Sequence, residues 1–196
     1  MNELWRELGR KAFHMLSLVY LAAYHLLGYP AVLRPMVVWL GFVAAVETGR
    51  FLSPRLYQAL TDLFRGLIRE SERRSFSGIF HTTAGALSVM LLAGPHPRVV
   101  TAALLCLALG DAAAALFGKA FGRHRILGGA KSLEGSLACL AVCVSVSLAA
   151  GLAPLPAAGG ALAATAVELA PTTRFFNDNL WMPVAAAAAM LALGAV

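Results

Sequence analysis

Seven apolar segments, most of them close to 20 residues long, constrain this chain more than any other feature of its sequence. They cover residues 12–29, 31–52, 77–94, 98–117, 133–152, 155–170 and 180–196. A helix needs about 20 mostly apolar residues to cross a bilayer. Only 13% of the residues are charged, whereas soluble domains usually carry about 25%. We therefore predict an all-α, polytopic membrane protein with about seven transmembrane helices.

The basic residues predict an orientation. When the segments are threaded alternately through a membrane, fourteen of the sixteen Lys and Arg residues fall on the side of the amino terminus, and only Arg34 and Arg98 fall on the other. Lys and Arg concentrate in cytoplasmic loops, so we expect a cytoplasmic amino terminus in the cell (inner) membrane. This distribution indicates topology, and no nucleic-acid partner is expected. We predict no secretory signal peptide, because the first apolar run lacks a clear cleavage site.

The one long polar connection, residues 53–76, predicts an amphipathic helix near 54–70. Leucines recur at helical spacing beside Arg65 and Arg69, a pattern typical of a helix lying in the membrane interface. Such a helix is either an anchor attracted to anionic lipid or part of the entrance for a lipid substrate.

Asp111 is the first candidate functional residue. Ala115, Gly118 and Gly122 follow it at helical spacing, so one helix face would read Asp, Ala, Gly, Gly. Such a face lets a ligand or another backbone come close, although small-residue packing between membrane helices also explains the glycines. It does not explain the acid, because a carboxylate in a membrane segment is costly and indicates function.

A helix start with a basic residue follows. Ser132 is predicted to be the N-cap of the fifth membrane helix, with Glu134 in its first turn. A helix start attracts phosphate, and Lys131 adds a positive charge there. A Walker A loop is excluded, because Ala130 stands where that motif requires glycine. The alternative is an ordinary capped helix with Lys131 as a basic anchor.

The amino terminus carries a third polar group. Arg10 and His14 share a helical face with Glu7, and Lys11 is four residues from Glu7. Ion pairs with Glu7 are one explanation. His14 lies inside the apolar run, where it either bonds a backbone carbonyl or faces a substrate.

Further polar residues stand at the same predicted side of the membrane. Glu47 and Arg50 are spaced for an ion pair, whereas Glu168 has no local partner. The acids Asp111, Glu134, Glu168 and Asp178 are candidates for a Mg²⁺ site, since Mg²⁺ favours carboxylates together with substrate phosphates. The alternative for Asn177-Asp178-Asn179 is a turn that caps the last helix.

Two other groups of residues are predicted to be structural. His81, beside Thr82 and Thr83, is expected to make internal hydrogen bonds. The cysteines are expected to act as small hydrophobic residues; they are Cys106, Cys139 and Cys143.

Together these motifs resemble the membrane superfamily that contains CDP-diacylglycerol synthases and the CTP-dependent lipid kinases (dolichol kinase, phytol kinase and yeast-type diacylglycerol kinase). The shared core is Asp111, Gly118-Lys119, Phe121-Gly122 and Lys131-Ser132-Leu133-Glu134-Gly135. Three regions are similar to the kinase branch: Glu7 with Arg10-Lys11 and His14; Glu47 and Arg50 with Leu67-Ile68-Arg69-Glu70; and Glu168, Pro171, Asn177-Asp178-Asn179 and Pro183. The closing Pro-Gly-His-Gly-Gly motif of the synthases is missing from the sequence, and Asn177 stands where many kinase relatives carry an acid.

The resemblance implies that residues 1–196 form a single transmembrane catalytic domain. Its expected activity is CTP-dependent, Mg²⁺-assisted phosphorylation of the hydroxyl of a membrane lipid alcohol: a polyprenol, phytol, geranylgeraniol or diacylglycerol. The alternatives are a cytidylyltransferase of the synthase type and a lipid or ion transporter. Homo-oligomerisation stays open.

The resemblance and the chemistry of the side chains imply four sets of roles. The expected catalytic residues are Asp111, Lys131, Asp178, Arg10, Lys11, His14 and Glu168. The expected nucleotide-binding residues are Gly118, Lys119, Gly122, Lys131, Ser132, Glu134 and Gly135. The expected metal ligands are Asp111, Asp178 and Glu134, and the residues expected to line the substrate site are Glu47, Arg50, Asn177 and Asn179.

Overall fold

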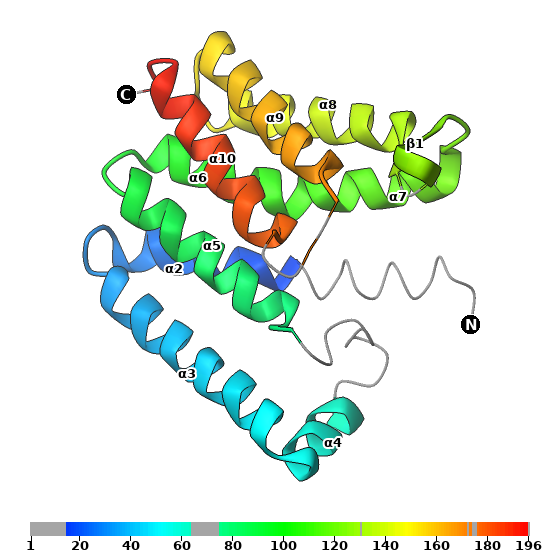
Figure 1. The fold of residues 1–196 in the computed structure, drawn as a ribbon. Helices are drawn as coiled ribbons and strands as arrows, with labels where there is room; N and C mark the ends of the chain where they lie inside the picture. Colours follow the sequence, from blue (N-terminus) through cyan, green and yellow to red (C-terminus); the bar gives the residue numbers. More distant parts are fainter. Residues whose placement is uncertain (1–14, 64–74, 130, 172, 174–175, 196) are drawn as a thin grey trace.

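Helices make up nearly all of the regular structure in the computed structural model, which describes residues 15–63, 75–129, 131–171, 173 and 176–195. The elements in chain order are η1 (Met15–Ser17), α2 (Leu18–Leu27), α3 (Leu33–Leu52), α4 (Pro54–Leu63), α5 (Gly78–Ala93), α6 (Pro97–Leu105), η3 (Cys106–Gly110), α7 (Asp111–Phe121), β1 (Arg125–Ile126), η4 (Leu127–Gly129), β2 (Lys131–Ser132), α8 (Leu133–Ala149), α9 (Pro154–Leu169) and α10 (Asp178–Ala192) (Figure 1). The predicted all-α fold class is confirmed.

The helices follow the apolar pattern of the sequence, but most are shorter than predicted. A helix lies in each of the seven predicted segments. Within the described residues, only Leu33–Leu52 and the continuous helix Pro97–Phe121 are long and apolar enough to cross a membrane. The 16 residues of α5 rise only about 24 Å at 1.5 Å per residue, less than the roughly 30 Å of a hydrocarbon core. Seven full-length membrane helices are therefore not observed in the part of the chain that the structure describes.

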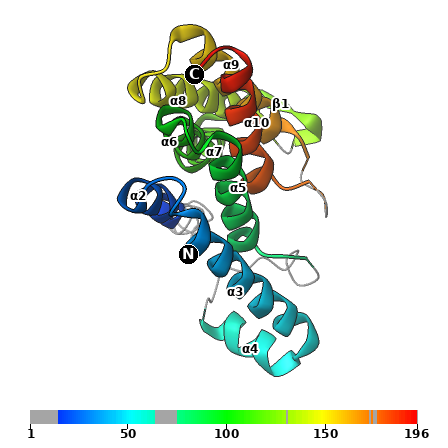
Figure 2. The same cartoon turned by 90° about the vertical axis from the view of Figure 1, so that its left-hand side faces the viewer.

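Successive helices run in alternating directions, so their connections gather at two ends (Figures 1 and 2). One end, here the Gly94 end, contains the turns at residues 28–32, 94–96 and 150–153. Its turns are linked by side chains, since Tyr24 Oη donates a hydrogen bond to Gly94 O (2.6 Å) and Arg98 Nη1 donates one to Gly151 O (3.3 Å). The opposite end, here the Lys131 end, contains the start of α4, the β1–β2 hairpin and the α9–α10 connection.

The core lies where η3, α8 and α10 meet. Cys106, Cys139, Cys143 and Met182 are fully buried there, and the cysteines are free thiols, as predicted. Gly110 makes this packing possible, because a Cβ at that position would lie 2.5 Å from Cys143 Sγ and 3.1 Å from Met182 Cε. The π-helical turn η3 ends at this glycine, immediately before Asp111.

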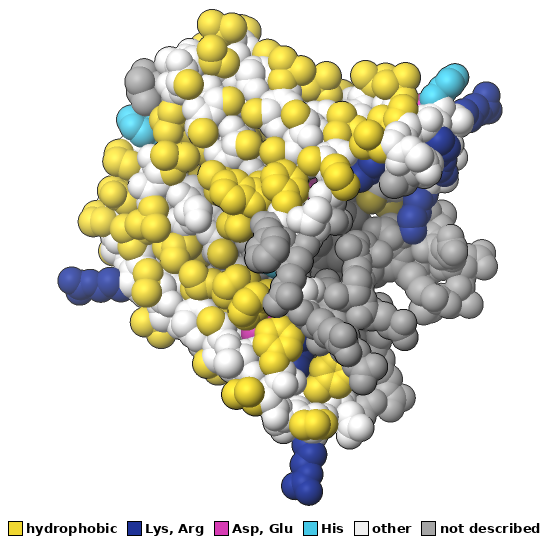
Figure 3. All heavy atoms as spheres, in the orientation of Figure 1, with side chains coloured by type: hydrophobic (Ala, Val, Ile, Leu, Met, Phe, Trp, Pro, Cys, Tyr) yellow, Lys and Arg dark blue, Asp and Glu magenta, His cyan; other side chains and the backbone are white. Residues whose placement is uncertain are grey.

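Much of the outer surface is apolar. Figure 3 shows hydrophobic side chains covering most of the described part of one face. α3 is exposed along most of its length, with Val38 73% and Phe42 57% accessible, and Figure 2 shows α3 and α4 extending away from the other helices. Contiguous apolar surface of this kind marks contact with lipid or with another protein.

The predicted amphipathic helix is present in its first part. α4 covers Pro54–Leu63, while residues 64–70 of the prediction, including Arg65 and Arg69, lie outside the described residues. α4 packs back on the end of α3, where a Cβ on Gly49 would lie 3.1 Å from Leu56 Cδ2.

Candidate functional site at the Lys131 end

Ser132 caps α8 as predicted. Its Oγ accepts a hydrogen bond from Gly135 N at 3.2 Å, and Leu133 N donates to His124 O at 3.0 Å. Two of the N–H groups that a helix start normally leaves open therefore already have partners. A phosphate at this helix start would depend on the charge of Lys131 and on the helix dipole.

The glycines of the predicted Asp-Ala-Gly-Gly face are used in packing α7 against α8. A Cβ on Gly118 would lie 3.0 Å from Ser132 Oγ, and one on Gly122 would lie 2.8 Å from the same atom. Gly135 approaches from the other helix, because its Cβ would lie 2.6 Å from Ala114 O. The Ser132 side chain and the α8 backbone at Gly135 therefore fill the space that a bare face leaves, as the helix-packing alternative predicts.

Glu134 is turned towards the β1–β2 hairpin. Its Oε1 accepts a hydrogen bond from His124 N at 3.1 Å and lies 2.8 Å from His124 Nδ1. Among the described residues, no three His, Cys, Asp or Glu side chains form a group that could hold a metal ion. A protein cage for Mg²⁺ is thus not part of the described structure.

Lys131 forms an ion pair with Glu168, 37 residues later in the chain. Lys131 Nζ donates a hydrogen bond to Glu168 Oε1, which ties β2 to the last turn of α9. The Glu168 side chain is only 5% exposed, whereas that of Lys131 is 28% exposed. Glu168 Oε2 is buried and has no hydrogen-bond partner within the described part of the chain. The local sequence does not reveal this pairing.

The Asn177-Asp178-Asn179 segment caps α10. Asn177 Oδ1 and Asp178 Oδ1 both accept a hydrogen bond from Asn179 N, at 3.0 and 2.9 Å. The capping alternative is therefore observed for Asn177, while Asp178 is a half-buried carboxylate in the first turn. The carbonyl oxygen of Asn179 faces α5, since a Cβ on Gly85 would lie 2.7 Å from it.

The predicted ion pair between Glu47 and Arg50 is confirmed and buried, with 2.5 Å between Glu47 Oε2 and Arg50 Nη2. The same carboxylate oxygen accepts a hydrogen bond from Ser77 N (3.2 Å), and Arg50 Nη2 donates one to Ser75 O (2.8 Å). The pair therefore fastens the end of α3 to the segment before α5.

His81 differs from its prediction. Its Nδ1 is buried without a hydrogen-bond partner among the described residues, so the expected internal hydrogen bond is wrong for this atom. Thr83 does bond internally, to Tyr20 Oη at 2.6 Å and to Ile79 O at 2.8 Å. The carboxylates of Asp178 and Glu47 are close enough to act electrostatically on the imidazole. In the sequence, His81 could have been selected as a candidate site residue because it is a histidine inside an apolar run, which is also the reason for selecting His14.

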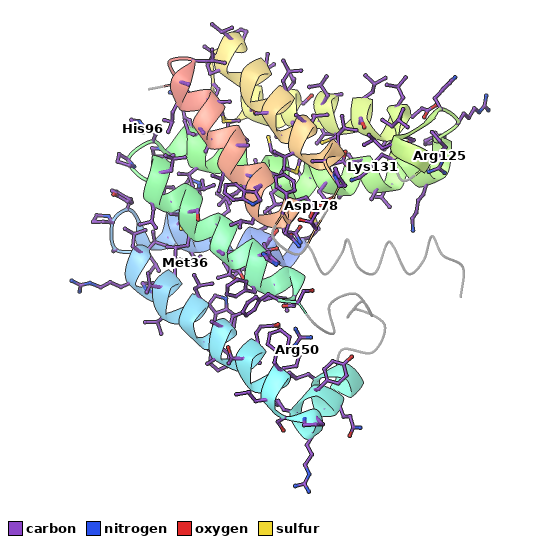
Figure 4. All side chains as sticks on the ribbon, in the orientation of Figure 1. Met36, Arg50, His96, Arg125, Lys131 and Asp178 are labelled. Carbon is purple, nitrogen blue, oxygen red and sulfur yellow. The ribbon has the colours of Figure 1, made fainter. Side chains whose placement is uncertain are left out.

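Most of the described candidates lie towards the Lys131 end of the molecule. Figure 4 shows Lys131 and Asp178 near the end of α9 and the start of α10, with Arg50 further along α3 and His96 at the opposite end. Asp111 directly follows Gly110, and Gly110 packs against Met182. Met182 lies one turn after Asp178 in α10. Lys119 is exposed on the last turn of α7. The remaining candidates lie outside the described residues: Arg10, Lys11 and His14.

No protein-family model, no curated protein and no solved structure matches this chain.

Proposed function

We propose that this chain is a CTP-dependent kinase that phosphorylates the hydroxyl of a membrane lipid alcohol. The observation that carries the proposal is the group of charged side chains, buried to different degrees, at one end of an otherwise apolar helical structure. Glu47, Arg50 and Glu168 are buried, Lys131 and Asp178 are half-buried, and Lys131 is paired with Glu168. Charged groups inside a membrane protein are expensive and are kept for function.

The proposed setting is the cell (inner) membrane, crossed seven times, with the amino terminus and the Lys131 end in the cytoplasm and α4 in the interface. Two observations support it. The exposed surface is rich in large apolar side chains. Of the described Lys and Arg residues, only Arg34 and Arg98 lie near the Gly94 end, in agreement with the positive-inside rule. The shorter helices cross if the bilayer thins locally around them.

The chemistry proposed for the site is the transfer of the γ-phosphoryl group. The hydroxyl oxygen of the lipid forms a bond to phosphorus, the bond between phosphorus and the β–γ bridging oxygen breaks, and CDP leaves. The hydroxyl proton passes to a carboxylate, either Asp178 or Glu168. Such a reaction depends mainly on positioning and charge neutralisation, for which Lys131 and Lys119 supply positive charge.

The ion pair of Lys131 supports a role in nucleotide binding. Glu168 holds the ammonium group at a partly open position, since the lysine side chain is 28% exposed. When the lysine turns to a phosphate oxygen, Glu168 becomes an unpaired, buried carboxylate able to accept a proton. Arg10, Lys11 and His14 belong to the proposal as groups approaching from the first membrane segment.

The residues also fit Mg²⁺ delivered together with the nucleotide. Mg²⁺ is usually held by one or two carboxylates together with phosphate oxygens, not by a protein cage, and Asp111 and Asp178 are the acids proposed for it. Glu134 is the third proposed ligand, but its hydrogen bonds to His124 would first have to break. When bound, the ion neutralises charge on the phosphates.

The test is a transfer assay with the purified protein in mixed micelles containing phytol, geranylgeraniol, a polyprenol or diacylglycerol. CTP carrying label at the γ-phosphate should transfer that label to at least one alcohol, whereas CTP carrying label in cytidine should not. Cytidine label in the lipid, with release of pyrophosphate, would instead identify a cytidylyltransferase. Solute flux across sealed vesicles without nucleotide consumption would identify a transporter.

A further inference from the structure

His81 holds a buried polar atom that the described part of the chain leaves without a hydrogen bond. Nδ1 is shielded from solvent and has no partner there, although the neighbouring Thr83 has two. Buried polar groups in folded proteins nearly always have a partner. A ligand that donates a hydrogen bond would provide the missing one.

Carboxylates from two other helices act electrostatically on the imidazole. Asp178 comes from the start of α10 and Glu47 from the last turns of α3, and both act on His81 electrostatically. Asp178 is also bonded to Asn179 N, and Glu47 to Arg50 and Ser77. These contacts hold the acids in place. The charge of Glu47 is balanced by Arg50, so the Asp178 carboxylate is the group that disfavours a carboxylate ligand beside His81, and a neutral donor suits the site.

A row of aromatic rings connects His81 with the outer surface. The Phe80 ring meets His81 edge-on at 5.6 Å between centroids, Phe76 stacks on Phe80 at 4.3 Å, and Phe51 of α3 meets Phe76 at 5.6 Å. Phe51 is 42% exposed and Phe76 is 37% exposed. Apolar rings therefore lead from the surface of the molecule to one buried hydrogen-bond acceptor.

We propose that His81 binds the hydroxyl group of the acceptor lipid, which donates a hydrogen bond to Nδ1, while the hydrocarbon chain lies along Phe51, Phe76 and Phe80. The inference rests on the kinase function proposed above and specifies the acceptor as a lipid with a neutral hydroxyl head group. A neutral imidazole with its proton on Nε2 accepts at Nδ1. The Asp178 carboxylate disfavours a fatty acid in place of the alcohol by charge repulsion, which is a common source of specificity, whereas the charge of Glu47 is balanced by Arg50.

Substitutions at His81 test the contact. His81→Asn keeps an acceptor near the position of Nδ1, whereas His81→Leu fills the space without one. The leucine variant should raise the KM for the alcohol about 3- to 10-fold, the effect of one neutral hydrogen bond, and leave the KM for CTP within about twofold of wild type. His81→Asn and the control His96→Ala, at the opposite end, should keep the wild-type KM for the alcohol. An unchanged KM for the alcohol in His81→Leu would overturn the inference.

A second experiment uses the unmodified protein. A long-chain alcohol with a diazirine beside its hydroxyl-bearing carbon should label residues 76–83 in mixed micelles. Excess alcohol should suppress the labelling, whereas a fatty acid of equal length should not. Labelling confined to other segments, or suppressed equally by the fatty acid, overturns the inference. Because the experiment needs no CTP, a protein that transfers no phosphate yet is labelled at residues 76–83 would refute the kinase function and retain the alcohol site.

Discussion

Lys131 and Glu168 form an ion pair in which the carboxylate is nearly enclosed and the ammonium group remains partly open to solvent. The two residues lie 37 positions apart, on either side of α8 in the sequence. The pair therefore joins the start of α8 to the end of α9 and sets the position of the lysine proposed to meet the nucleotide.

The unequal burial of this pair predicts unequal effects of removing either partner. Lys131→Met should lower the free energy of unfolding by about 3 kcal/mol, because it leaves a buried carboxylate without its counter-ion. Glu168→Gln should cost about 1 kcal/mol, since the lysine can turn towards water and the amide still accepts a hydrogen bond. Thermal unfolding in detergent micelles measures both. The double variant should be more stable than Lys131→Met alone, and equal effects of the two single variants would contradict this explanation.

The close contact of α7 with α8 predicts that a single methyl group at Gly135 will be harmful. Gly135→Ala should destabilise the protein by about 1–3 kcal/mol, the usual cost of overpacking, because its Cβ would lie 2.6 Å from Ala114 O. Gly41→Ala is the matched control. Gly41 lies within α3 with nothing near the position of a Cβ, so alanine there should stabilise the helix by about 1 kcal/mol. Opposite signs in thermal unfolding are expected, and a stabilising Gly135→Ala would show that the two helices are not packed this closely.

The proposed orientation predicts which side of the membrane each end faces. Arg125→Cys, in the hairpin, should react with a membrane-impermeant maleimide only from the cytoplasmic side, and Arg34→Cys only from the outside. The native cysteines are fully buried, so wild type should give little background. Labelling of right-side-out and inverted vesicles distinguishes the two. If both introduced cysteines react from one side, the number of crossings between them is not the one proposed.

Local patterns in the sequence predict local structure well here. Apolar periodicity locates a helix in every predicted segment, Ser132 caps α8, and Glu47 pairs with Arg50 at a spacing of three residues. Each of these features depends on residues within one or two helical turns. Most of the helices are shorter than predicted, and glycines end several apolar runs early; Gly28, Gly94 and Gly151 lie at such ends. The helix Pro97–Phe121 is instead longer than the predicted segment 98–117.

The sequence does not predict contacts between distant segments of the chain. The partner of Glu168 lies across a helix, and Glu134 pairs with His124 only because the β1–β2 hairpin folds back. The unsatisfied Nδ1 of His81 depends on how α3, α5 and α10 pack. Such relationships follow from tertiary packing, so a pattern of residue types along one segment cannot reveal them.

A substitution at Asp178 tests whether its segment acts only by capping α10 or also through the negative charge of the Asp178 carboxylate. Asp178→Asn keeps a side-chain oxygen able to accept from Asn179 N, as Asp178 Oδ1 does at 2.9 Å, so stability should change little. Loss of the negative charge should reduce phosphate transfer about 100-fold or more, the scale seen when a group that stabilises a transition state is removed. The KM for the alcohol should change far less than kcat.

The neighbouring residue provides the control for Asp178. Asn177→Ala removes the other oxygen bonded to Asn179 N and should cost about 1 kcal/mol of stability, as for other helix caps, while transfer continues at a rate close to wild type. Unfolding midpoints and initial rates with γ-labelled CTP report the two effects separately. If Asp178→Asn retains full activity and Asn177→Ala loses it, the segment acts through its capping geometry, and the carboxylate of Asp178 has no part in the reaction.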